Sequence, residues 1–223
     1  MRNRTFSNLA LALVLTAWVV LTPTAIVAAP TPSGIVKFDA SGPLGELGSI
    51  NYDGSTASGS GLFLNSLSLY SGGELVFEDS GYEPQAAPFQ YAFDTFAGIL
   101  SVDYVGGSFQ FPLTPPVTIM SGTGNFSILA ATDLLTITGT GFDTKDTLFL
   151  ATIFGVDAAQ FDPAALYEFG FSLTAEAYTD EFGTTWNVSE ASITNQVPEP
   201  ATLLLLGLGL AGCGFFGRRK TKA

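Results

Sequence analysis

The chain has 223 residues and a formal net charge of −12, with 20 acidic residues, 8 basic residues, 1 cysteine and no histidine. The lack of histidine excludes Ser-His-Asp and Cys-His nucleophilic catalysis and His-based zinc or iron sites. Because an acidic protein repels nucleic acid, we expect no nucleic-acid partner.

Residues 1–28 are predicted to be a secretory signal peptide. Arg2 and Arg4 precede an apolar run over residues 9–21, and small residues follow it. This order is typical of a signal peptide, and the small residues favour cleavage between Ala28 and Ala29. An uncleaved signal anchor is the alternative. With cleavage, the mature chain begins outside the cytoplasm.

Residues 29–196 are predicted to form one exported acidic domain. Of the 20 acidic residues only Glu199 lies outside this region, so it holds 19 acidic residues against two basic ones, Lys37 and Lys145, for a net charge of −17. Apolar residues are abundant enough to form a core. The region has no cysteine, so disulfides do not stabilise it.

Apolar and polar residues alternate with a period of two through most of this domain, which indicates half-buried strands. Gly, Ser and Asp clusters separate roughly eleven short strands, and only residues 162–166 suggest a helical turn. The pattern predicts an all-β fold, a single antiparallel β-sandwich of jelly-roll type. The expected strands include residues 35–40, 62–70, 74–78, 89–93, 98–105, 126–130, 134–138, 147–154, 168–177 and 185–193.

No residue is singled out as catalytic, and we expect the protein not to be an enzyme. Without histidine or exported cysteine, the chemistry left for an enzyme is a pair of carboxylates, as in glycoside hydrolysis. No Asp or Glu stands in a sequence context that marks it as one of such a pair.

Two acidic stretches are candidate calcium loops, since calcium binds six to eight oxygen ligands. Asp143 and Asp146 stand three apart in a predicted loop, and residues 78–83 form a second oxygen-rich turn. Solvated acidic turns are the simpler interpretation. We therefore predict no metal site and no cofactor, with calcium kept as an alternative.

Aromatic residues offer a way to bind sugars, because an exposed ring can stack on a sugar ring. Tyrosine and tryptophan tolerate water better than phenylalanine does. Tyr104 and Trp186 are therefore the predicted sugar-stacking residues, whereas alternating phenylalanines are expected in the core.

The last 27 residues, 197–223, are a separate targeting segment. Pro198, Glu199 and Pro200 precede the uncharged residues 201–217, and the basic residues Arg218, Arg219 and Lys220 follow. As a helix, residues 201–217 reach about 25 Å, slightly less than the hydrocarbon core of a bilayer. We predict a transmembrane helix in the inner membrane, with the basic end in the cytoplasm.

This segment resembles the PEP-CTERM sorting signal of Gram-negative bacteria, which has the same order of Pro-Glu-Pro triplet, apolar helix and Arg-rich end. The resemblance implies that an exosortase-type processing enzyme recognises Pro198, Glu199 and Pro200 and removes the helix. It also implies delivery to the cell surface or into the extracellular polysaccharide matrix. An ordinary membrane anchor is the alternative.

The functional prediction follows from the tail and the strand pattern together. We expect an exported, structural or adhesive component of the surface or biofilm matrix, with exopolysaccharide as a candidate partner. A carbohydrate-active enzyme with two carboxylates and a calcium-stabilised binding module are the alternatives.

Overall fold

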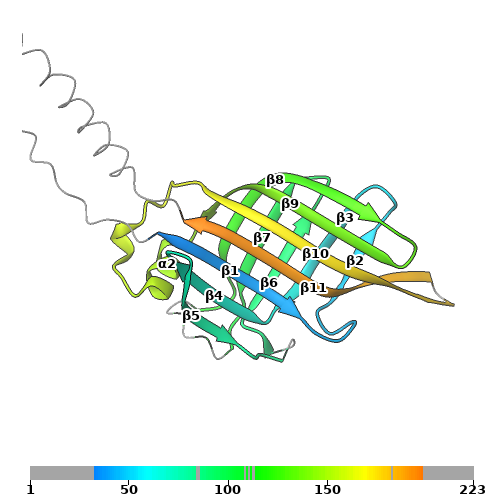
Figure 1. Ribbon diagram of the computed structural model, residues 1–223, viewed down its shortest axis with the longest axis horizontal. Coiled ribbons are helices and arrows are strands. Elements are labelled where there is room, and N and C mark those ends of the chain that lie inside the picture. Colours follow the sequence, from blue (N-terminus) through cyan, green and yellow to red (C-terminus); the bar gives the residue numbers. More distant parts are fainter. Residues whose placement is uncertain are drawn as a thin grey trace, which may run out of the picture.

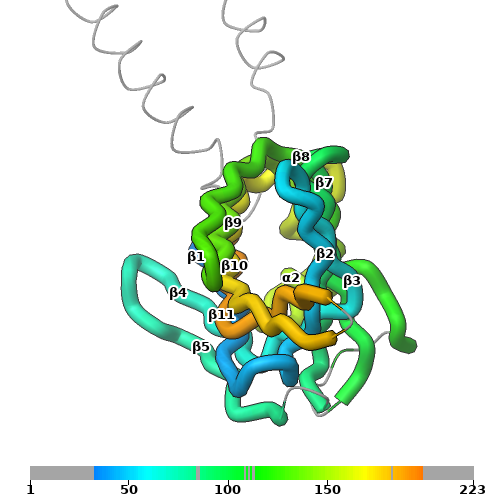
Figure 2. The backbone as a smooth tube through the Cα atoms, turned by 90° about the vertical axis from the view of Figure 1, so that its right-hand side faces the viewer, coloured from blue at the N-terminus to red at the C-terminus, as the bar shows by residue number. Residues whose placement is uncertain are grey.

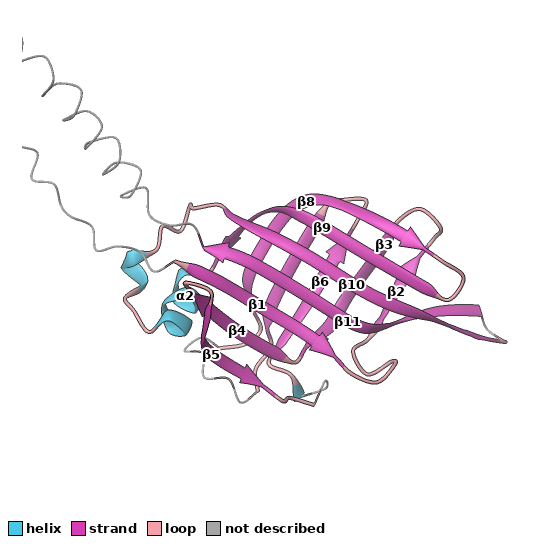
Figure 3. Ribbon diagram, in the orientation of Figure 1, coloured by secondary structure: helices cyan, strands magenta, loops and turns pink. Residues whose placement is uncertain are grey.

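The computed structural model describes residues 33–83, 86–107, 109, 111, 114–181 and 183–197. Strands dominate this part of the chain (Figure 3), as predicted for an all-β protein. The strands are β1 (Gly34–Ser41), β2 (Ser49–Tyr52), β3 (Ala57–Leu64), β4 (Ser66–Ser71), β5 (Glu74–Ser80), β6 (Phe89–Asp94), β7 (Ile99–Tyr104), β8 (Val117–Ala130), β9 (Leu134–Lys145), β10 (Tyr167–Asp180) and β11 (Gly183–Val197). A helix, α2 (Thr147–Phe154), and a 3-10 helix, η2 (Ala158–Gln160), lie between β9 and β10.

The prediction of a β-sandwich is wrong, because the sheet closes on itself. Eight strands follow one another in the order β10-β9-β8-β7-β6-β3-β2-β11, and β10 also pairs with β11, which completes a closed barrel. Figure 2 shows the strands arranged as a ring. Alternation with a period of two is the same in a sandwich and a barrel, so the sequence pattern did not distinguish them.

Glycines on β8 and β9 let an aromatic ring from β10 fill the barrel interior. The ring of Phe169 packs so close to Gly122, Gly124 and Gly141 that a Cβ atom at any of them would lie 2.8–3.0 Å from it. Gly141 pairs with both Gly124 and Phe169 across the sheet. Three glycines thus face one large ring at this point of the barrel, an arrangement common in the interior of small barrels.

The strands β1, β4 and β5 extend the sheet beyond the barrel. The second half of β11 pairs with β1, which pairs with β4, which pairs with β5. Figure 1 shows this extension beside β11, with α2 near one end of it. Phe149 of α2 stacks on Phe38 of β1 at a centroid distance of 6.0 Å and meets Phe89 of β6 edge to face. The helix therefore fills the space between the extension and the barrel.

The expected strand over residues 147–154 is instead the helix α2. The side chain of Asp146 accepts a hydrogen bond from the Phe149 backbone N–H at 2.9 Å, and Gly155 adopts a left-handed conformation with φ 66°. These are the N-cap and C-cap of a helix. The run between them is apolar on all sides, and periodicity cannot assign such a run to either element.

Other expected elements differ in their bounds. The expected strand over residues 62–70 is interrupted at Asn65, whose side-chain amide donates to the Ser41 carbonyl at 2.8 Å. The expected helical turn at residues 162–166 is a non-helical turn in which the Asp162 side chain accepts from the Ala164 N–H at 2.9 Å. The strand β2 was not predicted.

The first and last described strands end side by side. Gly34 at the start of β1 pairs with Val197 at the end of β11. The signal-peptide side and the sorting-signal side of the exported domain therefore meet at the same end of the barrel. Within the described ranges, no helix is long and apolar enough to cross a membrane. The predicted transmembrane helix at residues 201–217 lies outside those ranges.

Candidate functional site

A shallow groove of about 820 Å³ crosses the outer face of β8, β9, β10 and β11. These four strands lie next to one another in Figure 1. We call this feature the outer groove. Its lining includes residues 97–98, 123–125, 140–142, 168–170 and 194–196, together with Ile35. It lies near the end of the barrel where β11 reaches Val197.

A glycine creates the depression in the middle of this groove. Gly170 pairs with Thr140 on one side and Thr194 on the other, so the three positions form one row across the sheet. A Cβ atom at Gly170 would lie 2.8 Å from the Thr194 hydroxyl oxygen. The neighbouring side chains on β10 that share this outward phase are Glu168 and Ser172, which are both exposed. Removing one side chain from the row leaves a hollow flanked by two hydroxyl groups.

The groove joins one apolar ring to several neutral polar groups. Phe142 is 53% exposed and lies opposite Glu168 on the adjacent strand. Amide groups come from Asn125 and Gln196, and hydroxyl groups come from Thr123, Thr140 and Thr194. An exposed ring beside neutral donors and acceptors suits a polar ligand with apolar faces, such as a sugar.

The sequence analysis missed the two residues that shape this groove. Phe142 occupies an outward position of β9, where its alternate neighbours are Thr140 and Thr144. An aromatic residue in the polar phase of a strand is a signal of surface function, but the predicted strand ended at residue 138 and the signal appeared only with the full β9. Gly170 carried no such signal, because its role depends on which residues pair with it.

Tyr104 was wrongly predicted as an exposed sugar-stacking residue. It is 5% exposed, and its hydroxyl donates to the Phe109 carbonyl at 2.8 Å. Trp186 is half-buried and meets Tyr52 edge to face at 5.9 Å. It lines a second, smaller groove of about 450 Å³ with Asp53 and several hydroxyl groups. The Thr56 and Ser55 backbone N–H groups, followed by their hydroxyl groups, lower the pKa of the Asp53 carboxyl.

The two carboxylates of the first candidate calcium loop bind different partners in the structure. Asp143 belongs to β9 and points into the barrel, where its carboxylate forms an ion pair with Lys145 and accepts a hydrogen bond from the Asn195 amide. Asp146 caps α2. Both carboxylates therefore have protein partners: Asp143 lies within β9, whereas Asp146 lies in the connection between β9 and α2.

The buried polar cluster of Asp143, Lys145 and Asn195 has unusual electrostatics. The three residues are 1%, 6% and 0% exposed. Burial raises the pKa of the Asp143 carboxyl, and burial lowers the pKa of the Lys145 amine to about 8 although the carboxylate opposes this shift. Removal from water disfavours the charged form of each group.

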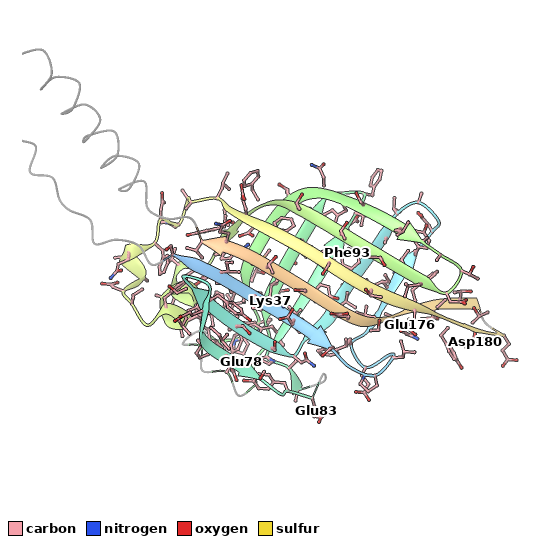
Figure 4. The ribbon with its side chains drawn as sticks, in the orientation of Figure 1. Lys37, Glu78, Glu83, Phe93, Glu176 and Asp180 are labelled. Carbon is pink, nitrogen blue, oxygen red and sulfur yellow. The ribbon has the colours of Figure 1, made fainter. Side chains whose placement is uncertain are left out.

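The second acidic stretch, residues 78–83, does not gather its carboxylates into one site. Glu78 lies in β5 and Glu83 follows this strand, and both are exposed. The other labelled acidic residues, Glu176 and Asp180, lie on β10, away from this stretch (Figure 4). Asp79 accepts a hydrogen bond from the Tyr82 hydroxyl. Among the described residues, no group of three or more His, Cys, Asp or Glu is arranged to hold a metal ion.

The predicted sorting and cleavage residues lie outside the described ranges. These are Ala28, Ala29, Pro198, Glu199, Pro200, Arg218, Arg219 and Lys220. Six of them, from Pro198 to Lys220, lie within residues 196–220, which match the model of the PEP-CTERM protein-sorting motif. The chain carries a PEP-CTERM motif.

The PEP-CTERM motif makes this chain an exported protein that is sorted in association with a membrane and processed by an exosortase-type enzyme. The match begins at Gln196, inside β11, so the motif starts where the barrel ends. No curated protein and no solved structure matches the chain. The function of the barrel is therefore argued from its own surface.

Proposed function

We propose that the barrel is a non-catalytic binding module that attaches the sorted protein to neutral polysaccharide at the cell surface or in the extracellular matrix. The observation that carries this proposal is the outer groove, where the half-exposed Phe142 ring stands beside amide and hydroxyl groups. The ring stacks on the apolar face of a sugar, and the polar groups bond to its hydroxyls.

The charges near the groove favour a neutral ligand. The predicted exported region has a net charge of −17, counted from 19 acidic and two basic residues. An acidic polysaccharide would be repelled by that field. Lys37 of β1 borders the groove, because it pairs with Thr194 of the lining, but it is already paired with Asp39 at 2.9 Å. No free cation of the described lining is therefore available for an anionic sugar.

The number of carboxylates in the groove supports binding in place of hydrolysis. Glu168 is the one carboxylate of its described lining. Glycoside hydrolysis by the usual routes needs a pair of carboxyl groups on either side of the scissile bond. A single carboxylate among amides and hydroxyls fits a ligand that is held and left intact.

Two substitutions test the proposal by opposite routes. Phe142→Ala removes the stacking ring, and Gly170→Val fills the central hollow. Each is expected to weaken binding to the neutral fraction of exopolysaccharide purified from the protein's own host by about tenfold, which corresponds to roughly 1.4 kcal/mol. Co-sedimentation of the full-length protein with the polysaccharide measures this binding.

The matched control is Tyr178→Ala, which removes a ring that is 60% exposed on β10 but does not line the groove. It is expected to bind like the unchanged protein. Equal loss in all three variants, or no binding by the unchanged protein, contradicts a sugar site in this groove. Release of reducing sugar ends during the assay contradicts the non-catalytic part of the proposal.

A further inference from the structure

A lysine, an aspartate and an asparagine meet inside the barrel at its α2 end. Asp143 and Lys145 point inward from β9, and Asn195 points inward from β11, with β10 between the two strands. One carboxylate oxygen of Asp143 contacts the Lys145 amine and the other accepts from the Asn195 amide nitrogen. A single carboxyl group thus bridges an amine and a carboxamide.

We propose that Lys145 and Asn195 react within the folded barrel to form an isopeptide bond, with Asp143 as the catalytic acid and base. The three side chains supply the nucleophile, the acyl group and the proton carrier that such a reaction needs. The product is a covalent link between β9 and β11 in a domain that has no cysteine.

The reaction requires no oxidant and no cofactor. Asp143 takes a proton from the Lys145 ammonium, which leaves a neutral amine and a neutral carboxylic acid. The amine nitrogen attacks the Asn195 side-chain carbonyl carbon, while the acid donates its proton toward the developing oxyanion. The C–Nδ2 bond then breaks, the nitrogen leaves as ammonia with the protons returned through Asp143, and a new C–Nζ amide bond remains.

The surroundings favour the neutral forms that this reaction consumes. Burial raises the pKa of the Asp143 carboxyl and lowers the pKa of the Lys145 amine, so a proton moves from amine to carboxylate more readily than it does in water. The Lys145 amine also lies 5.1 Å from the centroid of the Tyr167 ring. Dry, aromatic surroundings exclude the water that would compete with the amine.

The acyl group is open to attack. The Asn195 side-chain oxygen is fully buried and has no hydrogen-bond partner among the described residues. A buried carbonyl oxygen without a partner is costly in a finished structure. Asp143 contacts the amide nitrogen of Asn195, so a half-turn of the carboxamide brings this oxygen to the protonated acid, which then donates to it as the carbonyl carbon is attacked.

A glycine makes room for the carboxyl group. Gly122 pairs with Asp143 across β8 and β9, and a Cβ atom at Gly122 would lie 2.7 Å from the Asp143 Cβ atom. The side chain of Asp143 therefore occupies space that any other residue at position 122 would take. This close fit holds the carboxyl group between its two partners.

The link would join two strands of the barrel close to the end of β11. Asn195 lies two residues before Val197, where β11 ends and the sorting segment begins. Lys145 lies two residues before α2. A covalent bond here ties the strand that leads to the sorting segment to a strand two positions away in the sheet.

Peptide mass mapping of the protein purified from its own host, after denaturation and peptic digestion, tests the proposal. We expect a branched peptide that contains both Lys145 and Asn195 and has lost the mass of one ammonia. Recovery of the two peptides only as separate, unmodified species overturns the proposal. A single peptide that contains both Asp143 and Lys145 and has lost one water, which indicates a lactam between their side chains, overturns it as well.

Variants assign the roles of the three residues. Lys145→Arg keeps the positive charge but cannot form the amide, and Asp143→Asn keeps the shape but has no acid, so both are expected to abolish the branched peptide. Lys37→Arg, at the exported domain's other lysine, should leave it intact. An undiminished branched peptide in Asp143→Asn contradicts the role of Asp143. The map of the unchanged protein decides the existence of the bond even if a variant does not fold.

Discussion

Phe169 and its glycine neighbours illustrate how single residues determine the width of the barrel. A Cβ atom at Gly141 would lie 2.2 Å from the Thr123 carbonyl oxygen and 2.8 Å from the Phe169 ring. These atoms belong to the backbone of one neighbouring strand and to a ring packed in the interior, and neither can move cheaply. The glycine is therefore required by packing.

The Gly141→Ala variant tests this requirement. Overpacking a filled interior typically costs about 1–3 kcal/mol, so we expect a loss of that size in the free energy of unfolding. Thr138→Ala, at an exposed position of the same strand, is the control and is expected to change stability by less than about 0.5 kcal/mol. Urea denaturation measures both variants. Equal stability of Gly141→Ala and the unchanged protein would show that the neighbouring backbone and the Phe169 ring can move to accept a methyl group, and that packing does not require the glycine.

The helix α2 shows how caps decide an element where the apolar pattern is ambiguous. Its residues would suit a buried strand, but the Asp146 side chain accepts from the Phe149 N–H and the Gly155 N–H donates to the Ala151 and Thr152 carbonyls. Phe149 and Leu150 are 1% and 0% exposed, so the helix is held by packing as well as by its caps. The element is chosen jointly by its ends and by the space it fills.

Replacement of Asp146 measures the contribution of the N-cap. Asp146→Ala is expected to reduce the free energy of unfolding by about 1 kcal/mol, because the Phe149 N–H loses its acceptor. Asp146→Ser retains an acceptor of suitable length and should stay within a few tenths of a kcal/mol. Thermal unfolding of the two variants provides the comparison. A loss of equal size in both would mean that the carboxylate charge matters more than the cap.

The whole molecule joins a barrel with one proposed binding face to a sorting segment at one end. The strands β1 and β11 meet at that end, where Gly34 pairs with Val197, so the first and last described strands end together. The proposed isopeptide link closes a loop of about 50 residues from Lys145 to Asn195, and by analogy with disulfides it would stabilise the fold by about 4 kcal/mol. Such a link would stabilise an exported domain that has no cysteine for a disulfide.

Sorting is tested on the full-length protein in its own host. Simultaneous replacement of Pro198, Glu199 and Pro200 by alanine should leave the C-terminal segment attached and the protein in the membrane fraction. The unchanged protein should be shortened at both ends and found at the surface or in the matrix. Intact mass and cell fractionation report both properties. If both forms keep residues 29–223 in the membrane, the segment acts only as an anchor.

The sequence predicts the candidate groove and the buried cluster to different degrees. Phe142 stands at a polar position of β9, but the strand predicted from the sequence ended at residue 138, so the exposure of Phe142 followed from strand phase only once the full length of β9 was known. Gly170 became significant only through its pairing with Thr140 and Thr194. Asp143 and Asn195 are 52 positions apart, and only the closed sheet brings them into contact. The alternation of apolar and polar residues along a strand indicates which way a side chain faces, whereas contacts between distant strands depend on pairing and register.

By itself the sequence determined the all-β character and the sorting motif, because alternation with a period of two and a linear signal are both local properties of the chain. The tertiary structure decided that the sheet closes, since closure depends on β10 pairing with both β9 and β11. It also decided that residues 147–154 form a helix, that Tyr104 is buried and that Asp143 meets Lys145 and Asn195 in the interior. These features depend on long-range pairing and on the space left between packed elements, which no short stretch of sequence encodes.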